Sequence, residues 1–110
     1  MGNQKLGRKP NSQIRDNIVE LLFYLKEAYG YELYKKYKKI YPQQISMRSV
    51  YYHLTKGVDL NIFAIKEVQE VQGDYSWGTG TKRVIFTLGQ EAKPKQLKEI
   101  YFKLAELKRN

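Results

Sequence analysis

Apolar residues recur every three or four positions in four stretches of the chain, and this spacing predicts four helices. The first helix is expected to start at an N-cap on Asn11 or Ser12 and to run to about Ala28. The other three are expected over about residues 31–40, 46–57 and 94–109. The helix at 94–109 is amphipathic, so it must cover apolar surface on its own domain or on a second copy of the chain.

The third helix, SMRSVYYHLTKG, has two contrasting faces. Its packing stripe is predicted to be Met47, Val50, Tyr51, Leu54 and Val58. Its outer face is predicted to carry Arg48, Ser49, Tyr52, His53 and Lys56. Ser46 is a suitable N-cap, and Gly57 suits the left-handed position at a helix C-terminus. The sequence therefore indicates both ends of this helix.

A β-type pattern follows the third helix. Residues 83–88 alternate Val84, Phe86 and Leu88 with Arg83, Ile85 and Thr87, which predicts a strand. Residues 64–72 are rich in isoleucine and valine, but their three-residue spacing fits either a bulged strand or a helix, and we favour the strand. The intervening QGDYSWGTGTK is rich in glycine and predicts a hairpin tip at 72–82.

The order of these elements predicts an α+β fold. Only Tyr41 to Ile45 separate the second helix from the third, which is typical of a helix-turn-helix, and the hairpin would then form a wing. We expect a flexible basic arm over residues 1–11, a winged helix-turn-helix domain over 12–92, and a C-terminal helix over 93–110. The fold would have three helices, a two-stranded β-hairpin wing and the C-terminal helix.

Composition narrows the possible functions. The 110 residues carry a net charge of +9 and a pI near 9.7, which favours a polyanionic partner such as nucleic acid. The chain has no cysteine and one histidine, so a metal centre, a cofactor site or a catalytic triad is not expected. It has no apolar run long enough to span a membrane and no apolar signal core. We therefore expect a soluble cytoplasmic protein.

The third helix offers the groups that duplex DNA requires. Arg48 suits bidentate contact with a guanine edge, while Ser49 and Lys56 suit phosphates or bases. Tyr52 and His53 fit DNA contact about as well as half-buried packing.

Two further regions are candidates for DNA contact. In the second helix, Lys35, Lys36, Lys38 and Lys39 would lie near a flanking backbone. In the wing, the candidates are Tyr75, Trp77, Lys82 and Arg83, which would reach a minor groove or stack on unpaired bases. The alternative for Trp77 is that it folds back onto the hairpin.

Three motifs in this order resemble the winged helix-turn-helix transcription factors, and most of all the PadR-type regulators. They are GYELYKKY at 30–37, SVYYHL at 49–54 and KRVIFTLGQEA at 82–92. The resemblance covers roughly residues 14–92. It implies a sequence-specific double-stranded DNA-binding protein that regulates transcription, and a homodimer formed through the C-terminal helix.

The sequence also bears on two other classes of function. Winged helices also serve as protein–protein adaptors or as RNA-binding modules, and ten tyrosines would suit such a surface. An enzyme is not expected, because the chain lacks a paired acid and base signature, a P-loop and a dinucleotide-binding fingerprint.

Overall fold

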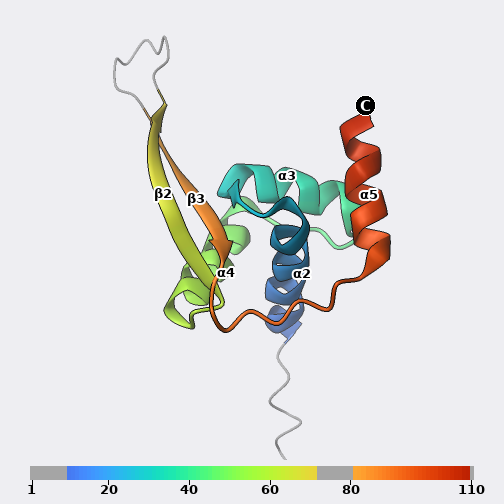
Figure 1. The fold of residues 1–110 in the computed structure, drawn as a ribbon, viewed down its shortest axis with the longest axis horizontal. Helices are drawn as coiled ribbons and strands as arrows, with labels where there is room; N and C mark the ends of the chain where they lie inside the picture. The colour runs from blue at the N-terminus through green and yellow to red at the C-terminus, as the bar shows by residue number, and fades with distance from the viewer. Residues whose placement is uncertain (1–9, 72–80, 110) are drawn as a thin grey trace, which may run out of the picture.

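The computed structural model describes residues 10–71 and 81–109, and these residues form an α+β fold. The described helices are α2 (Pro10–Leu25), α3 (Gly30–Ile40), α4 (Met47–Asp59) and α5 (Lys98–Arg109). The described strands are β1 (Ala28–Tyr29), β2 (Phe63–Val71) and β3 (Thr81–Leu88), and they form one antiparallel sheet in the order β1-β3-β2. Figure 1 shows the β2–β3 hairpin on one side of the molecule, α5 on the other, and α2 and α3 between them. The expected α+β class is confirmed.

The first helix differs from its predicted bounds at both ends. Asn11 and Ser12 lie inside α2, so neither is the cap, and residues 10 and 11 belong to the helix instead of the expected arm. The helix ends at Leu25 because Lys26 takes a left-handed φ of 75°. This early end frees Ala28 and Tyr29 to pair with Phe86 and Ile85 as the short strand β1, which the sequence did not predict. The rest of the expected arm, residues 1–9, lies outside the described residues.

The start of α4 is as predicted, and its end is not. The Ser46 hydroxyl oxygen accepts a hydrogen bond from the backbone N–H of Ser49 at 3.1 Å, which confirms the N-cap. At the other end the helix continues through Gly57 to Asp59, and Asn61 takes the left-handed conformation with φ 63°. Gly57 is needed for packing, since a Cβ there would lie 2.1 Å from the Phe63 ring.

The sheet confirms the expected bulged strand. Ile65 pairs with Phe86 and Glu67 pairs with Ile85, so Lys66 is the extra residue of a β-bulge. The Lys66 ammonium forms an ion pair with Glu27, which lies just before β1. Because β3 is the central strand, Ile85 has cross-strand neighbours on both sides and is buried, although the alternating pattern groups it with Arg83 and Thr87.

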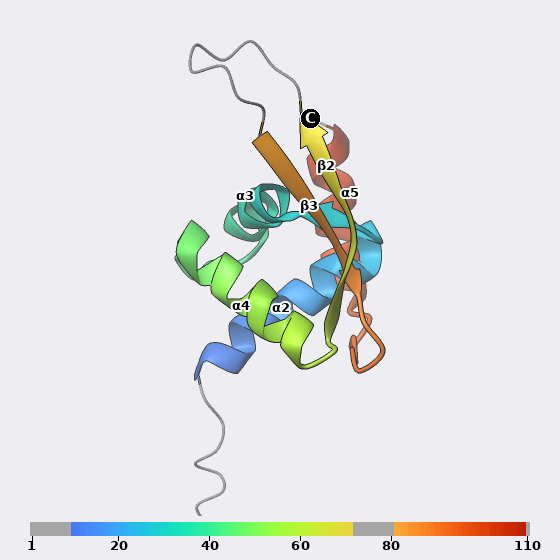
Figure 2. The same cartoon turned by 90° about the vertical axis from the view of Figure 1, so that its left-hand side faces the viewer.

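The hydrophobic core lies between the sheet and the helices. Fourteen buried residues form one cluster, and each of the four described helices and three described strands contributes to it. They are Ile18, Val19, Leu21, Leu22, Ala28, Leu33, Tyr37, Ile40, Val50, Leu54, Phe63, Phe86, Ile100 and Leu104. Figure 2 shows α4 crossing in front, with the hairpin rising from its C-terminal end. This packing fixes α4 against α2 and α3 along one side and leaves its other side open to solvent.

The last helix is shorter than predicted and packs on its own chain. It starts at Lys98 instead of Pro94, and Ile100 and Leu104 are buried in the core. The preceding residues are extended and are held by Glu20, whose carboxylate accepts backbone hydrogen bonds from Lys95, Gln96 and Leu97. Among the helices of the described residues, none has the length and apolar character that a membrane span requires.

Candidate nucleic-acid interface

The open side of α4 carries a continuous stripe of polar and aromatic side chains. Arg48, Tyr51, Tyr52, Thr55 and Lys56 are exposed and recur at three- and four-residue spacing, and we call this set the α4 outer face. It combines two cations with three hydroxyl groups, and its acidic neighbour Asp59 comes only at the end of the helix. Cations can contact phosphates or guanine, and hydroxyl groups can contact either phosphates or base edges.

Of the residues predicted for the outer face of α4, Arg48, Tyr52 and Lys56 are exposed, as expected. Ser49 is half-buried, and its backbone N–H is taken up by the N-cap. Val50 and Leu54 of the predicted packing stripe are fully buried, and Met47 and Val58 are half-buried.

His53 and Tyr51 have exchanged the positions that were predicted for them. His53 is 1% exposed, so its place on the outer face is wrong and the packing alternative for this residue is the correct one. Tyr51 is 44% exposed, so its expected place in the packing stripe is wrong as well. The buried residues of α4 are Val50, His53, Leu54 and Gly57, which keep perfect helical spacing, but the polar imidazole concealed that pattern in the sequence.

His53 is buried against a cation from the first helix. An Nη1 atom of Arg15 lies 2.9 Å from His53 Nδ1. Burial, and secondarily the charge of Arg15, lower the pKa of His53 below its ordinary value of 6.5. The contact ties α2 to the middle of α4 and explains why the residue is a packing group instead of a surface group.

The α3 lysines have individual partners. Lys35 lies over the ring of Tyr31, 5.3 Å from its centroid, and Lys38 lies over the ring of Tyr34 at 4.9 Å. The half-buried Lys36 forms an ion pair with Glu32 at 3.6 Å. Lys39 is exposed. These lysines provide positive charge next to α4, although Lys36 is partly neutralised by its partner.

Of the predicted wing residues, two can be placed. Lys82 is exposed and pairs in register with Glu70. The Arg83 guanidinium stacks on the ring of Tyr29, 4.1 Å from its centroid, so this side chain is anchored to β1. Tyr75 and Trp77 lie outside the described residues.

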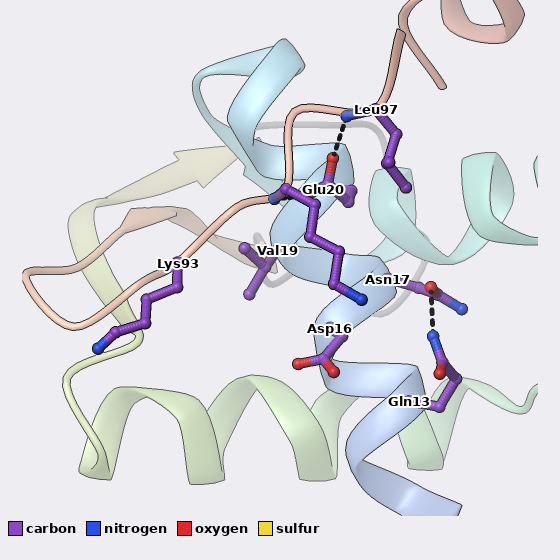
Figure 3. A pocket seen from close by; sticks show the side chains of 8 residues that line it. Gln13, Asp16, Asn17, Val19, Glu20, Lys93 and Leu97 are labelled. Atoms are coloured by element: carbon purple, nitrogen blue, oxygen red, sulfur yellow. Dashed lines mark hydrogen bonds between the residues drawn. The ribbon is translucent and has the colours of Figure 1, made fainter. Parts of the chain in front are cut away.

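A polar pocket lies on a different part of the molecule. It measures about 270 Å³ and lies between α2 and the segment that leads to α5 (Figure 3). Gln13 and Asn17 are hydrogen-bonded to each other across its wall, and Glu20 is directed at the backbone of Leu97. Glu20 uses its carboxylate to hold the C-terminal segment, while Asn17 also donates a hydrogen bond to the Tyr37 hydroxyl group of α3. Within residues 10–71 and 81–109, no cluster of three or more potential metal ligands occurs.

No protein-family model matches this chain, and no curated protein sequence matches it significantly. Function must therefore be inferred from the α4 outer face and from the elements that position it.

Proposed function

We propose that this protein binds double-stranded DNA in a sequence-specific manner, as a winged helix-turn-helix regulator of transcription in the cytoplasm. The observation that carries the proposal is the α4 outer face, on which Arg48 and Lys56 project with three hydroxyl-bearing side chains from a helix whose other side is buried. A helix presented in this way fits the major groove, where cations and hydroxyl groups meet both bases and phosphates.

The arrangement of elements supports the same proposal. The order α2, β1, α3, α4, β2, β3, with β3 at the centre of the sheet, is the order expected of a winged helix, with β2 and β3 as the wing. In this scheme α3 is the first helix of the helix-turn-helix, and α4 is the recognition helix. We place the chain with the PadR-type regulators on the strength of the three motifs at 30–37, 49–54 and 82–92.

The proposal extends to a homodimer formed through α5. Although Ile100 and Leu104 are used in the core, Tyr101 and Phe102 on the same helix are 51% and 63% exposed, and Leu97 just before the helix is 43% exposed. A second copy of α5 would remove this apolar surface from water. Two copies would also present two recognition helices to two half-sites.

Binding to random duplex DNA at several salt concentrations tests the first step. A protein that neutralises roughly five phosphates should lose affinity with a slope of about −4.5 in log K against log salt. Selection of bound DNA from a random pool then tests specificity, and a two-fold symmetric motif is expected. If no duplex is bound even at low salt, the proposal is wrong; if binding enriches no sequence, its sequence-specific part is wrong.

A further inference from the structure

Tyr51 of α4 lies directly on Gly30, the first residue of α3. A Cβ atom at Gly30 would lie 2.6 Å from the Tyr51 Cε1 and Cζ atoms and 2.7 Å from its hydroxyl oxygen. These distances are far below ordinary van der Waals contact, so any larger residue at position 30 would require the outer end of the Tyr51 ring to move. The outer half of the ring thus extends away from the α4 axis and reaches the first turn of α3.

Tyr51 is at the same time part of the α4 outer face. It is 44% exposed and follows Arg48 by three positions, and Thr55 follows it by four. A ring that rests on a backbone has fewer positions open to it than an exposed tyrosine on a free surface. Binding a partner through such a group therefore costs less side-chain entropy.

The position of the hydroxyl group distinguishes Tyr51 from the other residues of this face. It lies beside Gly30 at the start of α3. The next residue is Tyr31, and the Lys35 ammonium lies over its ring. When a recognition helix occupies the major groove, the preceding helix crosses the DNA backbone. A hydroxyl group at the junction of the two helices is thus close to phosphate oxygens, and it can donate a hydrogen bond to one of them.

We propose that Tyr51 is a phosphate contact of the DNA interface and that Gly30 is the residue that positions it. This inference rests on the proposed function and adds a residue that fixes the orientation of α4 on duplex DNA. A phosphate contact carries no base information, so its loss weakens binding to all sequences alike.

The positioning role is tested without DNA by a double-mutant cycle. Gly30→Ala is expected to be less favourable to the thermal unfolding midpoint in the unaltered chain than in a Tyr51→Ala background, because the new methyl group meets the Tyr51 ring only in the unaltered chain. In the Tyr51→Ala background the same change should leave the midpoint the same or raise it, since alanine favours a helix more than glycine does. An equal effect in both backgrounds would show that the ring does not rest on Gly30.

The contact role is tested by affinity for a selected sequence and for random duplex. Tyr51→Phe should weaken both by a similar factor of about three to ten, the range expected for one hydrogen bond. Gly30→Ala should weaken binding to both DNAs as well. The double variant, Gly30→Ala with Tyr51→Phe, should have an affinity within about twofold of that of the weaker-binding single variant. Gln90→Ala, which removes a neutral polar side chain from an exposed position outside the proposed DNA and dimer surfaces, is the control and should bind normally.

The outcomes separate the two proposals. If the unaltered chain binds no duplex, the proposed function fails and the contact role fails with it. If the unaltered chain binds and Tyr51→Phe binds equally well, only the contact role is wrong. A loss confined to the selected sequence would also overturn it, because that result identifies a base contact.

Discussion

The His53 imidazole is held as one tautomer by its neighbour. The Arg15 guanidinium has only hydrogen-bond donors, so the Nδ1 atom 2.9 Å away must accept, and the ring proton is on Nε2. Protonation of Nδ1 would place two cations in contact inside the protein. The neutral state of this one histidine is therefore part of the packing between α2 and α4.

Stability should fall as the pH is lowered through the histidine range. The pKa of His53 is lower in the folded protein than in the unfolded chain, so below about pH 6.5 the unfolded state binds more protons. Between pH 7.5 and 5.5 the free energy of unfolding should decrease, with a slope of at most about 1.4 kcal/mol per pH unit for one site. Urea unfolding at a series of pH values measures this free energy. Because His53 is the only histidine in the sequence, His53→Gln should remove most of this slope; an unchanged slope would contradict the assignment.

Arg48 is expected to determine sequence preference. A bidentate contact with guanine discriminates by about 1–3 kcal/mol, so Arg48→Ala should weaken binding to the selected sequence roughly 5- to 150-fold. Binding to random duplex should fall much less. Polarisation titrations on both DNAs measure the ratio, and Lys108→Ala on α5 is a control for the loss of one exposed cation. Equal losses on both DNAs would exclude a base-reading role.

The residue-level prediction of α4 was correct where burial follows hydrophobicity and wrong where a neighbouring helix decides. Val50 and Leu54 lie at the centre of the packing stripe, and any helix with this pattern would bury them. Tyr51 and His53 lie on its two borders, where Gly30 and Arg15 select which side chain is covered. Those partners are 21 and 38 residues away in the chain, so the local spacing carries no information about them.

Among the elements, α5 depends on one buried carboxylate for its approach to the core. Glu20 is 4% exposed and accepts hydrogen bonds from three successive backbone N–H groups, at 3.2 Å for Gln96 and 3.0 Å for Leu97. The Tyr24 hydroxyl group also donates to the Leu97 carbonyl oxygen at 3.1 Å. The two side chains of α2 thus fix the point at which α5 begins.

Removal of the Glu20 carboxylate should loosen α5. Glu20→Ala leaves backbone donors without their acceptor, and the free energy of unfolding should fall by about 1–3 kcal/mol. In this variant, amide hydrogen exchange should speed up more in α5 than in β3, relative to the unaltered protein. Glu106→Ala, at an exposed position of α5, should change stability by less than about 0.5 kcal/mol. If exchange in α5 is unaffected by Glu20→Ala, the carboxylate does not hold the helix.

The elements that repeat a clear periodicity were predicted, and those that depend on partners were not. The helices and the strand at 83–88 were located to within a few residues. Strand β1 was missed because two residues cannot show alternation, and it exists only through pairing with β3. The end of α4 was placed too early because Gly57 is a typical terminator, whereas here it accommodates the Phe63 ring.

At the scale of the whole molecule, the exposed aromatic surface of α5 predicts association. Phe102 is the most exposed of its large apolar residues, at 63%. If two copies pair through this helix, Phe102→Glu should convert a dimer into a monomer, because it would bury a charge at the interface. Sedimentation or light scattering measures the mass. Lys103→Glu, on the adjacent residue, controls for the added negative charge, and a monomeric unaltered protein would contradict the prediction.

The overall α+β architecture followed from the order of the predicted elements, since short connections leave few arrangements. The candidate site could be located on α4 for the same reason. The contacts that refine it could not be predicted: Arg83 stacks on Tyr29, and Lys36 pairs with Glu32. The ion pair offsets the charge of Lys36, and the stacking holds the Arg83 side chain against β1.

The bulge at Lys66 has a consequence for the geometry of the hairpin. Because residues 65 and 67 oppose consecutive residues of β3, removal of Lys66 alone would leave every other cross-strand partner unchanged. The shortened strand would lose the extra local twist that a bulge imposes, and the Val71–Thr81 end of the hairpin would swing relative to α4. Nuclear Overhauser contacts should then still pair Glu67 with Ile85, while residual dipolar couplings report the new direction. The single inserted residue Lys66 thus sets the direction in which the hairpin projects from the domain.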